Sequence, residues 1–144
     1  MKSVREVNKM LLNNQKIKSE IERLAPKYHL SLVVLFGSQV NNKTHPQSDV
    51  DLAFLSREQL RPSDIAKLNF EFSSRLGVKD LELVDLKNAP PLLLKQIAKK
   101  SILLYEEEPS LFANFRIYAL KRFMEAKKLL DLRELSLNKF LQTI

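Results

Sequence analysis

The stretch SLVVLFGSQVNNKTHPQSDVDLAFL, residues 31–55, decides the fold of this chain. Its first part, Ser31–Phe36, is apolar and partly β-branched and ends at Gly37, which is the pattern of a buried strand running into a tight turn. Glycine at that point lets the backbone come close to a ligand. If a short helix begins at Ser38, its free N–H groups and the serine hydroxyl would face the turn. The first half of the stretch therefore predicts a site for an anion such as a phosphate.

The second half of the stretch places two carboxylates on one side of a strand. Residues 48–55 alternate with period two, so Asp49 and Asp51 project from one face while Val50 and Leu52 project into the core. Two carboxylates roughly 7 Å apart can share hard cations, and magnesium binds nucleotide phosphates through such a small set of carboxylates. An ordinary turn and an exposed strand edge would explain either half alone. Together, after an apolar strand, the two halves indicate metal-dependent chemistry on a nucleotide.

A third acidic residue would complete such a site, either by binding metal or by deprotonating a substrate hydroxyl. The segment 80–86 supplies two candidates, and strand phase separates them. Glu82 lies opposite Leu81 and Leu83, on the non-core face, and is the residue that phase favours. Asp85 shares the face of the two leucines, unless the strand ends there and Asp85 caps the following turn. Either residue could also be an ordinary solvent-exposed charge at a strand end. We expect Glu82 to be the third acidic residue, with Asp85 as the alternative.

Length and composition describe one ordinary domain with a core of its own. The chain has 144 residues and no cysteine, which excludes a disulfide framework and a thiolate metal site. His29 and His45 are too isolated in the sequence to suggest zinc. No apolar run approaches membrane-spanning length, and the N-terminus lacks the apolar core of a signal peptide, so we expect a cytoplasmic protein.

The net charge of +7 is concentrated at the two ends of the chain. Residues 1–30 and residues 111–144 each carry seven Lys or Arg against three acidic residues, whereas the centre is close to neutral. Such basic ends could attract nucleic acid, but aromatic residues are not interleaved with them as they are in a stacking surface. Docking of an acidic protein would explain the basic ends equally well, and so would helix surfaces that simply face solvent. Direct nucleic-acid binding is therefore not the favoured interpretation.

Hydrophobic periodicity and turn residues outline the remaining elements. They predict helices on both sides of the central stretch and one further strand. The expected helices are 4–11, 17–24 ended by Pro26, 65–76 between Pro62 and Gly77, and Pro91 to about Lys100, and the expected strand is Ile102–Leu104. Strands flanked by helices indicate an α/β domain with a small sheet.

The acidic break at residues 106–110 starts a different region. Glutamates and a proline favour a helix start, so we expect a long helix from about Ser110 to Asp131. The apolar positions of this helix form a broad stripe, which consists of Phe112, Phe115, Tyr118, Ala119, Phe123, Ala126, Leu129 and Leu130. The tail 135–141 is again apolar and needs another surface, either on this chain or on a partner.

The quoted residues resemble a known family, the minimal nucleotidyltransferases of the DNA polymerase beta superfamily, whose signature is G-S-x10-D-x-D. The resemblance covers about residues 18–105 and is closest to the antitoxin of the paired HEPN/MNT toxin–antitoxin modules. It implies a nucleotidyltransferase fold, with a small mixed sheet flanked by helices, over residues 1–109. Residues 110–144 are then a C-terminal helical extension that packs on the domain or on a partner.

The resemblance also implies an activity and a set of roles. Gly37 and Ser38 would hold the triphosphate of ATP, Asp49 and Asp51 would bind two Mg²⁺ ions, and Glu82 would be the third carboxylate. The implied reaction is transfer of AMP from ATP to a tyrosine of the cognate HEPN ribonuclease toxin, within a hetero-oligomer. The alternatives are a small-molecule nucleotidyltransferase of the aminoglycoside type and a non-catalytic antitoxin that acts by binding alone.

Overall fold

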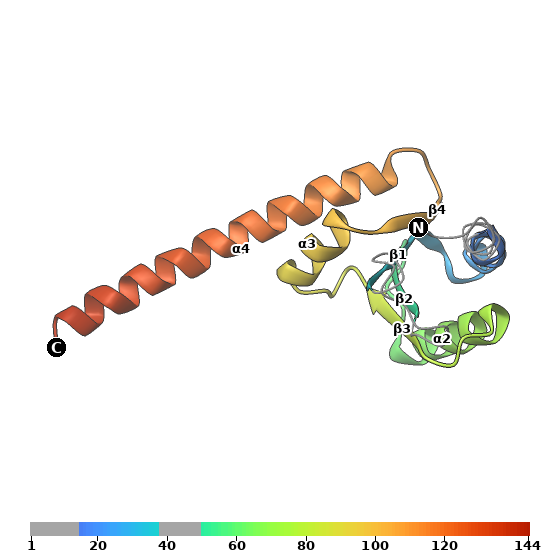
Figure 1. Ribbon diagram of the computed structural model, residues 1–144, viewed down its shortest axis with the longest axis horizontal. Helices are drawn as coiled ribbons and strands as arrows, with labels where there is room; N and C mark the ends of the chain where they lie inside the picture. The colour runs from blue at the N-terminus through green and yellow to red at the C-terminus, as the bar shows by residue number, and fades with distance from the viewer. Residues whose placement is uncertain (1–14, 38–49) are drawn as a thin grey trace, which may run out of the picture.

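The computed structural model describes residues 15–37 and 50–144 of the chain, and its elements follow the expected order (Figure 1). A helical segment at 15–24 comes first. The elements after it are the 3₁₀ helix η1 (Pro26–Tyr28), β1 (Leu30–Phe36), β2 (Val50–Ser56), α2 (Pro62–Leu76), β3 (Leu81–Asp85), α3 (Pro91–Lys99), β4 (Ile102–Glu106) and α4 (Leu111–Gln142). The helix expected at 4–11 lies outside the described residues.

The strands form one mixed sheet in the order β3-β2-β1-β4. β1 is antiparallel to both β2 and β4, whereas β2 and β3 are parallel. A parallel pair needs a crossover connection, and α2 supplies it. The predicted α/β class with a small mixed sheet is confirmed.

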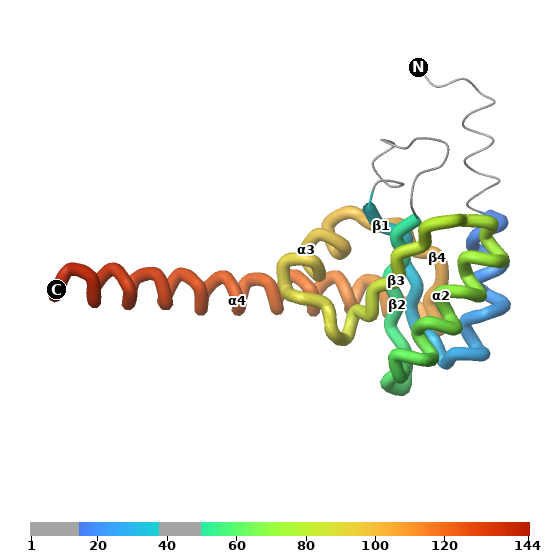
Figure 2. The backbone as a smooth tube through the Cα atoms, turned by 90° about the horizontal axis from the view of Figure 1, so that it is seen from below, coloured from blue at the N-terminus to red at the C-terminus, as the bar shows by residue number. Residues whose placement is uncertain are grey.

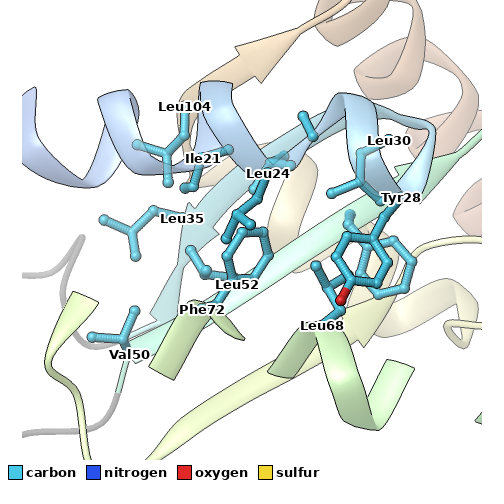
Figure 3. Close-up of a cluster of buried hydrophobic side chains, with 13 residues drawn as sticks. Ile21, Leu24, Tyr28, Leu30, Leu35, Val50, Leu52, Leu68, Phe72 and Leu104 are labelled. Carbon is cyan, nitrogen blue, oxygen red and sulfur yellow. The ribbon is translucent and has the colours of Figure 1, made fainter. Parts of the chain in front are cut away.

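Helices cover both faces of the sheet, so the domain has three layers (Figures 1 and 2). On one face the helical segment 15–24 and α2 pack on the strands through a cluster that includes Ile21, Leu52, Leu68 and Phe72, all fully buried (Figure 3). On the other face α3 and the start of α4 pack through a second cluster, which includes Val34 and Ile97. In β2 and β3 the alternation of the strand divides the side chains between these two clusters.

Local signals set the helix ends where the sequence predicted them. α2 begins with Pro62 at its first turn and ends at Gly77, whose φ of 66° is the left-handed conformation that favours glycine. α3 begins at Pro91. At the start of α4 the carboxylate of Glu106 accepts a hydrogen bond of 3.1 Å from the backbone N–H of Phe112, which satisfies one of the helix's free donors. The expected start of the last helix near Ser110 is confirmed.

The predicted end of the last helix was wrong. α4 runs without a break from Leu111 to Gln142 and includes both Asp131 and the apolar tail. The cause is that no glycine or proline follows Asp131, and the next residues are largely good helix formers. Phe115 and Ala119 are buried as expected, but Tyr118 is 53% exposed, so it does not belong to the core-facing stripe.

The described part of the chain contains no helix that is long and apolar enough to cross a membrane.

Candidate active site

The end of β1 and the start of β2 bring the glycine turn against a carboxylate. Phe36, the last residue of β1, is paired with Asp51 on β2. Gly37 follows with a φ of 82°. A Cβ atom built on Gly37 would lie 2.1 Å from Oδ2 of Asp51, well inside any allowed contact. Any side chain at this position would displace the Asp51 carboxylate, so the turn lies directly against the carboxylate that the sequence assigned to metal binding.

A second carboxylate lies beside Asp51 on the neighbouring strand. The parallel register of β2 and β3 pairs Asp51 with Glu82. Asp51 is in phase with Ala53, and Glu82 with Val84, and both of those residues belong to the cluster on the α3 and α4 face. Neighbouring strands are about 4.8 Å apart. The two carboxylates thus start from adjacent backbone positions and project from the same face of the sheet, Asp51 half-buried and Glu82 exposed.

Asp85 has a different environment from Glu82. It is the last residue of β3, and its carboxylate accepts hydrogen bonds from the backbone N–H of Lys87 at 3.0 Å and from Nδ2 of Asn88 at 3.1 Å. It caps the turn after the strand, as the sequence allowed. The structure therefore brings Glu82, and not Asp85, next to Asp51.

Ser38 and Asp49 lie outside the described residues, so the structure does not report on them. Within 15–37 and 50–144 there is no cluster of three or more Asp, Glu, His or Cys side chains that could hold a metal. The adjacent Asp51 and Glu82 offer the hard oxygen ligands that Mg²⁺ prefers. The donor chemistry of these two adjacent carboxylates thus fits a magnesium site.

A small open cavity of about 200 Å³ lies at the outer edge of β3, next to Glu82. Its lining includes Lys79 and Asp80, which precede β3, and Asn69, which belongs to α2. Nδ2 of Asn69 donates a hydrogen bond of 3.1 Å to the carbonyl of Leu81. Asn69 and Lys79 could not be placed near Glu82 from the sequence, because their proximity depends on how α2 packs on the sheet. This cavity is an open hollow at the edge of the sheet, and of the candidate site residues that the structure describes only Glu82 lines it.

Comparison with known proteins identifies the class. The family described as "Polymerase beta, Nucleotidyltransferase" matches residues 13–110, and the chain belongs to it. Within that class the chain is similar to protein adenylyltransferase MntA of Shewanella oneidensis. The two are 33% identical over 104 residues, which are 71% of this chain and 73% of that protein.

Solved structures agree in fold. A crystal structure of a toxin–antitoxin with AMP-PNP has a chain that is 25% identical, with a TM-score of 0.66 over 86% of this chain and 98% of that one. The tri-AMPylated Shewanella oneidensis HEPN toxin in complex with MNT antitoxin gives 24% identity and a TM-score of 0.62, over 92% of this chain and 98% of that one. The second likeness bears on the fold alone.

Proposed function

We propose that this chain is an antitoxin that transfers AMP from ATP to a tyrosine hydroxyl of its cognate HEPN ribonuclease toxin and so neutralises it. The observation that carries the proposal is the row formed by Gly37, Asp51 and Glu82, in which a close-approach turn lies against two adjacent carboxylates. Membership of the nucleotidyltransferase family and similarity to MntA support the reaction type and the acceptor.

The chemistry is an in-line displacement at the α-phosphorus of ATP. Gly37 and Ser38 hold the triphosphate, with backbone N–H groups of the turn donating to its oxygens. The tyrosine oxygen forms a bond to the α-phosphorus, the bond to the bridging oxygen of the leaving pyrophosphate breaks, and Glu82 accepts the hydroxyl proton or orients the hydroxyl. AMP-tyrosine and pyrophosphate are the products.

Asp49, Asp51 and Glu82 are the residues that would hold two Mg²⁺ ions. When bound, such ions neutralise the triphosphate and stabilise the charge that develops on the attacking and leaving oxygens. Asp51 is half-buried at the base of the turn. This burial would hold its carboxylate in one position next to the bound phosphates. A fully exposed aspartate, by contrast, would sample many positions.

The direct test is the Asp51→Asn variant, incubated with ATP, Mg²⁺ and the purified toxin. Transfer, measured as the mass gained by the toxin, should fall by at least about a hundredfold while the melting temperature is unchanged. Asp85→Asn is the matched control, since it makes the same change in charge at a carboxylate that accepts hydrogen bonds in the turn after β3. Undiminished transfer by a folded Asp51→Asn variant would refute the assignment. Toxin that is neutralised by the parent chain without any gain in mass would indicate occlusion instead.

A further inference from the structure

The distal half of α4, residues 127–142, extends away from the rest of the described chain and carries an uncovered row of leucines. Both views show this half projecting beyond the sheet and α3 (Figures 1 and 2). Leu130, Leu137 and Leu141 are 63%, 55% and 57% exposed. A helix of this length extends about 24 Å, which is enough to lie along another helix.

The row continues the stripe that holds the first half of α4 in the core. One pair of apolar positions recurs every eleven residues, which is close to three helical turns, so the three pairs lie on one face. The pairs are Phe115 with Ala119, Ala126 with Leu130, and Leu137 with Leu141. The first pair is buried, the second has a half-buried Ala126 and an exposed Leu130, and the third is exposed. The same face that packs within the domain therefore runs on, uncovered by the described residues, into the distal half.

Charge favours a different protein over a second copy as the occupant of this face. Arg133 interrupts the row, three residues after Leu130 and four before Leu137. Residues 111–144 carry seven basic against three acidic side chains, so two copies of α4 would bring like charges together. A partner with apolar residues spaced for helix packing and a carboxylate facing Arg133 would complement both features.

The distal half also belongs to the side of the molecule where the reaction is proposed. α3 and α4 pack on the same face of the sheet from which Asp51 and Glu82 project, as the cluster membership of Ala53 and Val84 shows. A protein seated on this half of α4 would be held on the face that carries the carboxylates.

We infer that the distal half of α4 is the docking surface for the helical toxin partner, which seats an apolar groove with an acidic rim on Leu130, Arg133, Leu137 and Leu141. This inference rests on the proposed function for the identity of the partner. The contact holds the acceptor protein, while the turn and the carboxylates act on its tyrosine.

The experiment is a titration of the full-length chain with the toxin encoded in the same module, purified separately. Leu130→Gln with Leu137→Gln removes two leucines from the row while keeping good helix formers. The matched control is Met124→Gln with Leu135→Gln, which removes two residues of similar exposure, 70% and 63%, from the opposite side of the helix. The row variant should raise the Kd for the toxin by about a hundredfold and the control by less than about threefold.

A second pair of variants tests the charge. Arg133→Gln should weaken toxin binding and reduce its dependence on salt, whereas Lys139→Gln, which removes the same charge from the other side of the helix, should change binding little. The row variant should raise KM for the toxin in AMP transfer and leave kcat at saturating toxin and ATP binding unchanged. Helix content measured by circular dichroism should be the same in all four variants.

The outcomes separate docking from catalysis. Unchanged toxin affinity in the row variant would overturn the docking surface while leaving AMP transfer by the parent chain intact. A parent chain that is dimeric in sedimentation, and that the row variant makes monomeric, would identify a second copy as the occupant and also overturn it. Toxin that binds through the row without ever gaining AMP would refute the proposed reaction and leave the docking surface standing.

Discussion

Replacing Gly37 by alanine tests whether the glycine turn positions the carboxylate. The new Cβ would lie 2.1 Å from Oδ2, 3.0 Å from Cγ and 3.2 Å from Cβ of Asp51. The carboxylate is the part that must move, by roughly 1 Å or more, because carbon–oxygen contacts below about 3 Å do not persist. The backbone at φ 82° adds its own cost, since a residue with a Cβ is strained in the left-handed region.

The expected magnitudes follow from these two costs. The left-handed backbone costs about 1 kcal/mol, and displacing Asp51 from its preferred rotamer costs about 1 kcal/mol more, so Gly37→Ala should lower the free energy of unfolding by about 2 kcal/mol. Transfer should fall further than stability, by about a hundredfold, because a misplacement of about 1 Å in a reacting site has that effect.

Gly77→Ala is the control for the backbone cost alone. Gly77 also has a positive φ, of 66°, but a Cβ there would meet no atom within 4 Å. Its variant should lose about 1 kcal/mol and keep full transfer activity. Urea unfolding and single-turnover AMP transfer measure the two quantities. If Gly37→Ala and Gly77→Ala lose the same stability and keep the same transfer rate, the turn at Gly37 does not position Asp51.

Two further predictions concern Glu82 and Tyr28. Glu82→Gln should reduce AMP transfer by about a hundredfold or more at unchanged stability, with partial rescue by Glu82→Asp, and equal rates for Gln and Asp would contradict a role for the carboxylate. Burial, and then the neighbouring Glu71 carboxylate, raises the pKa of Tyr28 from 10.0 to about 12. Because the folded-state pKa is the higher one, this contribution to stability is complete below pH 10 and is lost between pH 10 and 12. The free energy of unfolding should therefore fall over this pH range. Tyr28→Phe should therefore lose less stability than the parent between pH 10 and 12 when the free energy of unfolding is measured by urea titration. If stability falls equally with pH in parent and variant, Tyr28 does not titrate in this way.

The elements that depend on short-range sequence patterns were predictable. The strand at 31–36 and the strand around Val50–Leu55 carry their own periodicity, and Pro62 and Gly77 mark the ends of α2 through backbone preferences that need no tertiary contact. The phase of Glu82 against its leucine neighbours likewise gave its face of the sheet. The last helix was predicted too short, although no helix breaker follows Asp131.

Features that join distant segments were not predictable from one sequence. The pairing of β2 with β3, which makes Asp51 and Glu82 neighbours, depends on the crossover through α2 and on packing in both clusters. The contact between Gly37 and Asp51 depends on the register of β1 with β2. The cavity lined by Asn69 and Lys79 arises only when α2 docks. The sequence named the candidate residues, and long-range packing set their distances.

The packing of β3 on both faces has a consequence for how chains of this kind can change in length. Leu81 and Leu83 pack in one cluster, whereas Val84 and Leu86 pack in the other. One residue inserted within 81–86 would put the residues before it out of phase with those after it, so that one of the two groups would face the wrong cluster. The exposed connections at 57–59 and 87–88 have no such coupling. Among related chains we therefore expect insertions and deletions to collect at these connections and to be absent from 81–86.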